Sequence, residues 1–556
     1  MAYSGADLFV DTLEQYGVEH VFGNPGTTEL PVMKALAGSD LDYVLGLHED
    51  VAVGMAAGYA TTRRYHADDD ESVLPVGVAN LHVAPGLAHG LGNIYGASVA
   101  GAPLVVTAGN HSTEFRHEEP ILSGDLVEMT QQFTKWSAEV LDVEALPSML
   151  RRAFRVALTP PTGPVFLGLP LDVMMAETDA DPERLGAIPS GGRGDRSQVE
   201  RAADAFAEAE NPVLVVGDGV ARAGTDAVDA AVDLAEAAGA RVNAEILACE
   251  VDFPASHDQW VSYIPPDEDT ARTLLDTDMV AFVGCSTNTT LTAHSGDLVP
   301  DATFVHIGDD AWQLGKNQPA DVAVLGDPGE TMAEIATEVA DRVSDDERAD
   351  RRERVAAMKQ MAQAEMASGD ESDDPRRSKG ELVDALRDAA PDAYIVDEGV
   401  TAKYELLTRW PLEPEQAISN KGGGLGYGLP ASVGAALAES MRDDPRQVVG
   451  HVGDGSYLYY PQTLYSAARH DLDLTVVVPD NRNYRILKDN MQGLFGEGDY
   501  EYVGMDFDPP VDIPKNAESH GATGVRVDPE DDLDAALDAA LAESGPTVVD
   551  VLVHDD

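Results

Sequence analysis

Two short apolar segments near the carboxyl end of the chain, each followed at once by polar residues, constrain the fold most strongly. Residues 448–452, which include three valines, are apolar enough for a buried strand and lead into a Gly-Asp-Gly-Ser motif at 453–456. Residues 474–478 are mostly β-branched and lead into Asp480-Asn481. The connection between the two segments has helical spacing over 461–470. This order predicts one β-turn-α-β unit of a parallel sheet.

The polar residues after these two predicted strands should share one edge of the sheet, where open α/β sheets bind ligands. The Asp454 carboxylate, the Asn481 side-chain oxygen and a backbone carbonyl are the hard oxygen ligands that Mg²⁺ prefers. Ser456 and the N–H groups at the start of the next helix can face a phosphate. The sequence therefore predicts a magnesium site that holds a phosphate group.

A second Gly-Asp-Gly motif, at 217–219, shows how much of this inference depends on the spacing. It also follows an apolar segment, but no Ser follows the second Gly. The residue that stands as far after Asp218 as Asn481 stands after Asp454 is Glu245 rather than an Asn. We interpret this copy as an ordinary strand-to-helix turn.

Composition places the chain in the globular class. Its 556 residues are too many for one core and suggest about three domains. No apolar run of about 18 residues is present, and no basic segment precedes an apolar one at the start, so we expect a soluble cytoplasmic protein. The two cysteines, Cys249 and Cys285, have no metal-ligand spacing and fit buried positions.

The net charge of −62 is the most unusual bulk property. Hydrophobic residues make up 44% of the chain, so disorder does not follow from this charge. We expect a protein of a high-salt, halophilic cytoplasm, where screening over about 3 Å at 1 M salt makes the self-repulsion tolerable. Nucleic acid and anionic membranes are poor partners for this acidic surface, so we expect neither as a partner.

Alternating strand and helix patterns predict an α/β protein of three doubly wound, parallel-sheet domains. Strand patterns include residues 18–22, 74–79 and 212–216, and an Ala- and Gly-rich helix runs from Glu49 to Ala60. We expect an N-terminal domain over 1–180, a central domain over 190–345, a charged linker over 346–380 and a C-terminal domain over 381–556.

Two positions in the first domain could carry chemistry. Glu49 stands where a strand ends and the small-residue helix begins, which also suits an acid that only complements the helix dipole. The small residues of that helix would allow another backbone to approach closely, as at a subunit interface. His82 stands at the end of a strand, before a turn marked by Pro and Gly, where most histidines are merely hydrogen-bonded.

These motifs together resemble those of the thiamin-diphosphate-dependent 2-oxoacid decarboxylases. The diphosphate motif of that family ends in an Asn pair, from which Asp480 departs at the first position. Residues 22–31, the helix that begins at Glu49 and the Asn-Leu-His of 80–82 are similar to the N-terminal domain of benzoylformate decarboxylases. The resemblance spans essentially the whole chain, with the motifs in the family's order.

The resemblance implies roles for particular residues. The cofactor would be thiamin diphosphate with Mg²⁺, and the metal ligands would be Asp454, Asn481 and Asn483. The catalytic residues implied are Glu49, His82, Thr27 and His294. Glu49 would hydrogen-bond the pyrimidine ring, and His82 would act as an acid and base. Thr27 stands in place of a Ser of the family, and His294 stands slightly later in the sequence than the family's second catalytic His. The cofactor contacts implied are Glu49, Thr401, Gly423, Leu425, Asp454, Gly455, Ser456, Asn481, Asn483, Tyr484 and Ile486.

The resemblance also implies an assembly and a reaction. In the family, the Glu that matches Glu49 meets the diphosphate site of the neighbouring subunit. We therefore expect a homodimer or homotetramer with active sites at the dimer interface. The reaction would be non-oxidative decarboxylation of a 2-oxo acid, such as benzoylformate, to an aldehyde. The alternatives are a carboligase like acetolactate synthase and a non-catalytic cofactor-binding subunit. We expect no FAD, because the central domain has no Gly-x-Gly-x-x-Gly after a strand.

Overall fold

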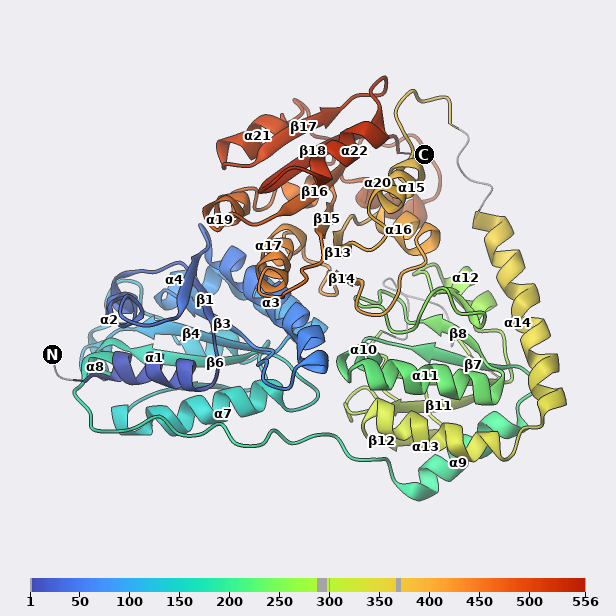
Figure 1. Ribbon diagram of the computed structural model, residues 1–556, viewed down its shortest axis with the longest axis horizontal. Coiled ribbons are helices and arrows are strands. Elements are labelled where there is room, and N and C mark those ends of the chain that lie inside the picture. Colours follow the sequence, from blue (N-terminus) through green and yellow to red (C-terminus); the bar gives the residue numbers. More distant parts are fainter. Residues whose placement is uncertain (1–2, 288–297, 300, 367–371, 556) are drawn as a thin grey trace. The chain divides into compact units, whose positions relative to one another are not determined.

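The computed structural model describes residues 3–287, 298–299, 301–366 and 372–555 and divides into two compact units (Figure 1). The first unit comprises residues 1–188, 374–403 and 422–556, and the second comprises 189–373 and 404–421. Among the described residues, none of the helices combines the length and the apolar content that crossing a bilayer requires.

The amino-terminal part of the first unit is a parallel sheet with the strand order β2-β1-β3-β4-β6-β5. Its strands are β1 His20–Gly23, β2 Asp42–Leu45, β3 Gly77–Leu81, β4 Leu104–Asn110, β5 Ser137–Glu139 and β6 Val165–Pro170. Its helices are α1 Gly5–Gln15, α2 Leu30–Leu36, α3 Glu49–Asp69, α4 Val83–His89, α5 Leu91–Ala100, α6 Leu126–Thr130, α7 Leu146–Leu158 and α8 Leu171–Met175, with short 3₁₀ turns η1 Thr27–Glu29, η2 Arg116–Glu118 and η3 Val143–Ala145.

The carboxyl-terminal part of the first unit contains a second parallel sheet, in which the strands run in the order β13-β15-β16-β18-β17. Its strands are β13 Tyr394–Glu398, β15 Val448–Val452, β16 Leu474–Asp480, β17 Thr523–Val527 and β18 Pro546–Leu552. Its helices are α15 Lys379–Ala389, α17 Gly428–Glu439, α18 Asp454–Tyr457, α19 Thr463–Arg469, α20 Arg485–Phe495, α21 Ile513–Ser519 and α22 Leu533–Leu541.

The second unit is built on a third parallel sheet, with the order β12-β11-β10-β7-β8-β9. The six strands of this sheet are β7 Pro212–Val216, β8 Arg241–Ala244, β9 Trp260–Tyr263, β10 Met279–Val283, β11 Thr303–Gly308 and β12 Val322–Leu325. The residues of the second unit also include the short strand β14 Ala417–Ser419, which is not part of this sheet. Its helices are α9 Arg196–Glu208, α10 Gly219–Arg222, α11 Thr225–Ala238, α12 Glu268–Leu274, α13 Pro328–Ala340 and α14 Asp345–Met366; α16 Lys403–Arg409 begins at the unit boundary.

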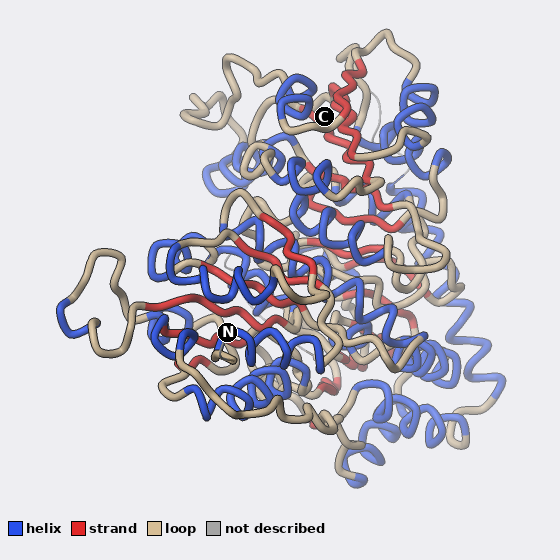
Figure 2. Tube along the Cα trace, turned by 60° about the vertical axis from the view of Figure 1, so that its left-hand side comes forward, coloured by secondary structure: helices blue, strands red, loops and turns tan. Residues whose placement is uncertain are grey.

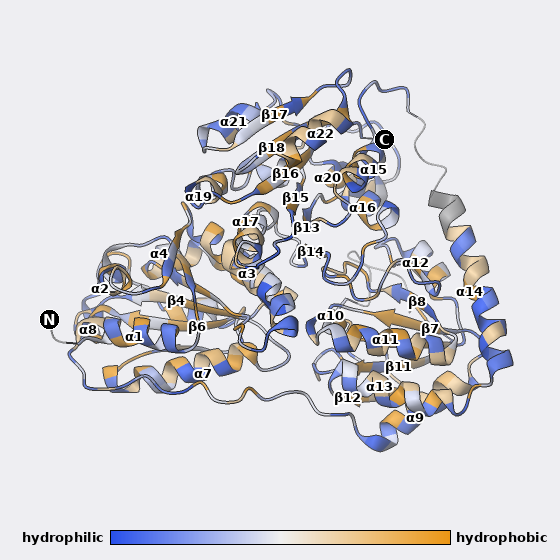
Figure 3. Ribbon diagram, in the orientation of Figure 1, coloured by the Kyte–Doolittle hydropathy of each residue, from blue (hydrophilic) through white to orange (hydrophobic). Residues whose placement is uncertain are grey.

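The predicted fold class is confirmed, because each of the three sheets is parallel and alternates with helices along the chain. Figure 2 shows the strands (red) lying side by side with helices (blue) around them. Figure 3 shows that the strands are mostly hydrophobic, while many helices alternate between hydrophobic and hydrophilic residues. Such near-continuous apolar strands are what sheets covered on both faces require. Strands β7 and β15 have the bounds that the sequence predicts.

Several elements of the first unit differ from their predicted bounds, and β3 and α3 differ for identifiable reasons. Strand β3 begins at Gly77 rather than at Leu74, because Pro75 has no N–H to donate to a ladder. Helix α3 continues past Ala60 to Asp69, since no Gly or Pro follows Ala60 to stop it.

The small residues of α3 let it pack against α17 of the same unit, so the close backbone approach expected for this helix occurs within the chain. A Cβ added at Gly58 would lie 2.2 Å from the Ala431 carbonyl oxygen, and one at Gly434 would lie 2.0 Å from the Met55 carbonyl oxygen. Both obstacles are backbone atoms, so neither can be relieved by a rotamer change.

We therefore expect Gly434→Ala to destabilise the first unit by about 1–3 kcal/mol, the usual cost of overpacking a core. Thermal unfolding in high KCl measures the effect. The matched control is Gly493→Ala on α20, where an added Cβ meets no atom within 4 Å. Equal unfolding temperatures for the two variants would contradict the packing described for α3 and α17.

Candidate functional site

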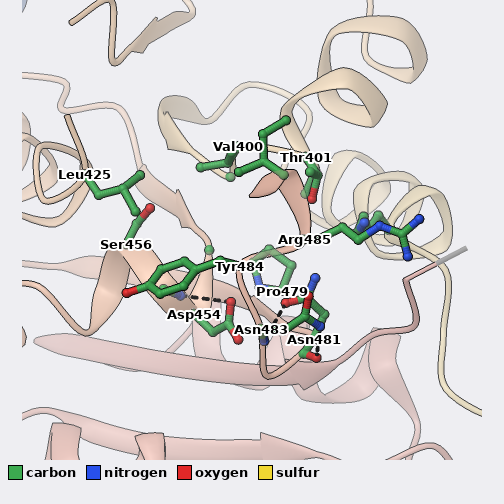
Figure 4. A pocket seen from close by; sticks show the side chains of 16 residues that line it. Val400, Thr401, Leu425, Asp454, Ser456, Pro479, Asn481, Asn483, Tyr484 and Arg485 are labelled. Carbon is green, nitrogen blue, oxygen red and sulfur yellow. Dashed lines mark hydrogen bonds between the residues drawn. The ribbon is translucent and has the colours of Figure 1, made fainter. Parts of the chain in front are cut away.

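The residues after β13, β15 and β16 line one pocket of about 440 Å³, part of which is open to solvent (Figure 4). Strands β13 and β16 both neighbour β15, so their carboxyl ends bring three loops to the same edge of the sheet. The predicted cofactor-binding residues that line this pocket are Thr401, Leu425, Asp454, Gly455, Ser456, Asn481, Asn483, Tyr484 and Ile486.

Buried polar atoms without a hydrogen-bond partner among the described residues show which groups could hold a ligand. They include Oδ2 of Asp454, Oγ of Ser456 and Oδ1 of Asn483, and all three residues line the pocket. A buried polar atom left unpaired costs about 1–3 kcal/mol, so such atoms mark places where a ligand can be bound. A carboxylate and an amide oxygen fit Mg²⁺, and a hydroxyl fits a phosphate oxygen, so the residues present fit a magnesium-bound diphosphate.

The Asp454 carboxyl lies in an unfavourable environment for its own negative charge. Burial and the neighbouring Asp480 carboxyl raise the pKa of Asp454 to about 8, and the Gly455 N–H at 2.8 Å offsets only part of this shift. Asp480 is itself buried, at the position where the family motif has an uncharged Asn. A divalent cation would neutralise this pair of carboxyl groups.

Three residues with side chains and positive φ angles adjoin predicted site residues. Val400, with φ 53°, precedes Thr401; Arg482, with φ 61°, separates Asn481 from Asn483; and Val83 follows His82 with φ 27°. The left-handed region is unfavourable for residues with side chains, above all for β-branched ones such as valine. Strain of this kind gathers at functional sites.

A second polar cluster lies at the ends of the adjacent strands β1 and β3, around His82. The His82 Nδ1 atom lies 2.7 Å from Oε2 of Glu29 and 3.2 Å from Oγ1 of Thr28. The Glu29 carboxylate also accepts hydrogen bonds from the Thr28 hydroxyl at 2.7 Å and from the Gly26 N–H at 2.9 Å.

These contacts determine which nitrogen of His82 is available for chemistry. An ionised Glu29 can only accept, so Nδ1 carries the proton and the lone pair of the neutral ring is on Nε2. The ring therefore presents Nε2 as a base, with its orientation set by Glu29. Gly26 is required here, because a Cβ at this position would lie 2.1 Å from the ring.

Glu49 begins helix α3, and its position is set by residues on either side. The His48 side chain caps the helix by accepting the Asp50 N–H at 3.1 Å. Asp50 accepts the Asn93 N–H at 2.7 Å and the Tyr460 hydroxyl at 3.0 Å. Glu49 itself is buried, with Oε2 3.1 Å from Nδ1 of His89.

Several predicted residues lie elsewhere. Glu49 and Gly423 are not among the described residues that line the Asp454 pocket. Thr27 is exposed at the start of η1, and its neighbour Thr28 makes the contact with His82. His294 lies outside the described residues.

The structure also adds residues for which the sequence offered little signal. Glu29 lies within the recognised motif of 22–31, but nothing in the motif shows that it pairs with His82. Lys379 and Arg485 line the Asp454 pocket and bring positive charge to it. Lys379 comes from the start of α15, and only the three-dimensional arrangement relates it to the Gly-Asp-Gly motif.

Models of three protein domains match the chain. Residues 3–137 match the N-terminal TPP binding domain of thiamine pyrophosphate enzymes, residues 199–335 match the central domain, and residues 401–551 match the C-terminal TPP binding domain. Curated relatives include a benzoylformate decarboxylase of Pseudomonas aeruginosa, 30% identical over 97% of both chains. The large subunit of acetolactate synthase isozyme 3 of Escherichia coli is 26% identical over 97% of this chain and 92% of that relative.

Solved structures of similar fold cover the whole chain. The thiamine diphosphate-dependent 4-hydroxybenzoylformate decarboxylase of Rhodococcus jostii RHA1 is similar with a TM-score of 0.84 and 28% identity, over 100% of this chain and 99% of that one. The benzoylformate decarboxylase of Polynucleobacter necessarius has a TM-score of 0.85 and 25% identity over the same shares.

Proposed function

The chain belongs to the thiamine pyrophosphate enzyme family, and on that premise we propose that it decarboxylates a benzoylformate-like 2-oxo acid to an aldehyde and CO₂. The observation that carries the proposal is the pair of polar clusters in the first unit. One is the Asp454 pocket with its unpartnered oxygens, and the other is the oriented pair of His82 and Glu29.

Each cluster has a distinct task in this proposal. Asp454, Asn481 and Asn483 hold Mg²⁺ and through it the diphosphate, and Ser456 donates to a phosphate oxygen. Thiamin diphosphate, when bound, supplies the electron sink that loss of CO₂ from a 2-oxo acid requires. His82 would accept and donate a proton at Nε2 near the reacting carbon. The buried Glu49 carboxyl group would share a proton with the pyrimidine ring in a hydrogen bond.

We further propose that two copies of the chain complete each site. Glu49 does not line the Asp454 pocket among the described residues, although the proposed chemistry needs both at one cofactor. A C₂ pair can supply Glu49 from one copy and Asp454 from the other. The pairing also makes turnover dependent on protein concentration once dimers dissociate.

The experiment that tests the function is CO₂ release from a panel of 2-oxo acids, with thiamin diphosphate and Mg²⁺ present. We propose about 2 M KCl for the assay, since the net charge of −62 needs strong screening. The panel contains benzoylformate, phenylpyruvate, branched 2-oxo acids and pyruvate, and each mixture is analysed for aldehyde and hydroxyketone. We expect cofactor-dependent aldehyde as the main product, with benzoylformate among the best substrates.

The similarity to acetolactate synthases makes carboligation the second candidate. Hydroxyketone as the main product would move the protein to that reaction. Saturable cofactor binding without turnover of any acid in the panel would contradict both enzymatic proposals.

A further inference from the structure

The two asparagines proposed as metal ligands are both held by one further carboxylate, that of Asp555. Asn481 donates from Nδ2 to Oδ1 of Asp555 at 2.9 Å. Asn483 donates from Nδ2 to the same carboxylate, with distances of 3.2 Å to Oδ1 and 3.1 Å to Oδ2. Asp555 is not among the described residues that line the Asp454 pocket, so it contacts the proposed ligands rather than the pocket itself.

These hydrogen bonds determine which way each amide group points. An ionised carboxylate only accepts hydrogen bonds, so the NH₂ group of each amide faces Asp555 and the amide oxygen faces away from it. The other hydrogen of Asn483 Nδ2 is donated to the Asn481 backbone carbonyl at 2.8 Å. Turning the Asn483 amide over would place its oxygen against two acceptors, so only one orientation is favourable.

The oxygens that this arrangement leaves available are the ones that a metal ion needs. Oδ1 of Asn483 is buried and has no hydrogen-bond partner among the described residues. Oδ1 of Asn481 accepts the Asn483 N–H at 3.3 Å and keeps a second lone pair. Both asparagines line the pocket that also contains the unpartnered Oδ2 of Asp454 (Figure 4).

The segment that carries Asp555 is fixed by its own backbone. The N–H of Val553, just beyond strand β18, donates to the Asp480 carbonyl at 3.0 Å. The N–H of His554 donates to the Arg377 carbonyl at 3.0 Å, and both Val553 and His554 are buried. Because Asp480 ends β16 and directly precedes the first of the two asparagines, these bonds bring Asp555 to the metal ligands.

A guanidinium group also faces the Asp555 carboxylate. Nη1 of Arg485 lies 3.8 Å from Oδ2 of Asp555, and Nε of Arg485 donates to Asp489 at 2.6 Å. The Asp555 side chain is 24% exposed, so it is partly shielded from water. Its contacts among the described residues are therefore two amides and a guanidinium, and all three are donors, which matches a carboxylate that only accepts.

We propose that Asp555 is a positioning residue of the metal site, which turns the amide oxygens of Asn481 and Asn483 toward the cation. This inference rests on the proposed function, because it needs Mg²⁺ at the Asp454 pocket. Groups that orient metal ligands in this way contribute about 10–100-fold to metal affinity. Asp555 stands 72 residues beyond Asn483, outside the motif that carries the ligands.

The test is calorimetric titration of Mg²⁺, and separately of Ca²⁺, into the metal-free full-length protein with thiamin diphosphate in excess. In about 2 M KCl, screening acts over less than about 3 Å, so losing the Asp555 charge should have little effect by itself. We expect Asp555→Ala to raise the dissociation constant of Mg²⁺ by about 10–100-fold, because both amides become free to turn.

Comparing the two metals separates positioning from a general loss of stability. Mg²⁺ demands near-ideal octahedral geometry, whereas Ca²⁺ accepts a flexible arrangement of oxygens. Asp555→Ala should therefore weaken Mg²⁺ binding more than it weakens Ca²⁺ binding. An unchanged dissociation constant for Mg²⁺, or equal weakening of both metals, would overturn the proposal.

The matched control is Asp473→Ala, which removes an aspartate at the opposite end of β16. Asp473 is exposed and accepts the Gly545 N–H at 2.8 Å, which ties the start of β16 to the start of β18. This variant should have a lower unfolding temperature. Its dissociation constants for both metals should stay within about twofold of those of the unaltered protein, as expected for distant, independent sites.

A measurement on the unaltered protein does not depend on any variant folding. Coupling is reciprocal, so Mg²⁺ with thiamin diphosphate should slow hydrogen exchange at the N–H groups of Val553 and His554, next to Asp555. Unchanged exchange there, with the metal bound, would overturn the inference and leave the proposed function standing. Failure of the unaltered protein to bind Mg²⁺ and thiamin diphosphate together would overturn both.

Discussion

Replacing Glu49 by Gln is expected to lower kcat for decarboxylation by about 10²–10⁴-fold, the usual contribution of a positioned acid or base. The amide keeps the shape of the side chain but cannot hold the proton that the proposed chemistry places on this carboxylate. Because the variant is nearly isosteric and Asp50 still fixes the start of α3, its unfolding temperature should change little.

The matched control for Glu49 is Asp7→Asn, which alters an acid in the first turn of α1. Asp7 accepts hydrogen bonds from the Ser4 N–H at 2.9 Å and the Ser4 hydroxyl at 2.6 Å. An acid that caps a helix and complements its dipole, which is worth about 0.3–1 kcal/mol, contributes to stability and not to turnover. If both variants keep most of the kcat of the unaltered protein, Glu49 has only a structural role at its helix, as Asp7 has, and the catalytic role proposed for Glu49 is wrong.

Replacing Asp454 by Asn is expected to weaken Mg²⁺-dependent binding of thiamin diphosphate by about 100-fold or more. Losing even an outer partner of a metal site costs about 10–100-fold in affinity, so losing a charged ligand should cost at least that much. Titration calorimetry at several Mg²⁺ concentrations measures the effect. Cofactor binding that is equally strong in the variant would remove Asp454 from the metal site.

The same variant should be more stable than the unaltered protein when both are free of cofactor and metal. Because burial and Asp480 raise the pKa of Asp454 to about 8, ionising it is costlier in the folded state than in the unfolded chain. The unaltered protein therefore loses stability as the pH rises from about 4 to 8, and the Asn variant lacks this loss. The difference in unfolding temperature should be large at pH 8 and vanish near pH 4.

Local pattern was sufficient where a single segment determines its own structure. Strand β15 and the turn after it follow from an apolar run stopped by Gly453, and strand β7 follows from the same kind of run. The spacing of Asp454 and Asn481 likewise places both in one pocket, because one β-turn-α-β unit brings their strands side by side.

Pattern was insufficient where partners are far apart in the sequence. The second Gly-Asp-Gly motif reads as an ordinary turn, since no local feature of residues 217–219 shows that Lys421 will pair with Asp218. The contact of His82 with Thr28 rather than Thr27 depends on the direction in which each side chain leaves the 3₁₀ turn η1. Such contacts are determined by tertiary packing, which no short window of sequence contains.

The most direct test of the central claim is benzaldehyde formation from benzoylformate by the purified protein in about 2 M KCl, which screens the acidic surface. The protein is first stripped of metal and cofactor, then assayed alone, with Mg²⁺ and thiamin diphosphate separately, and with both. The account predicts aldehyde only when both are present, in amounts equal to the CO₂ released. Aldehyde formed without thiamin diphosphate, or benzoylformate left unchanged while the cofactor is bound, would contradict it.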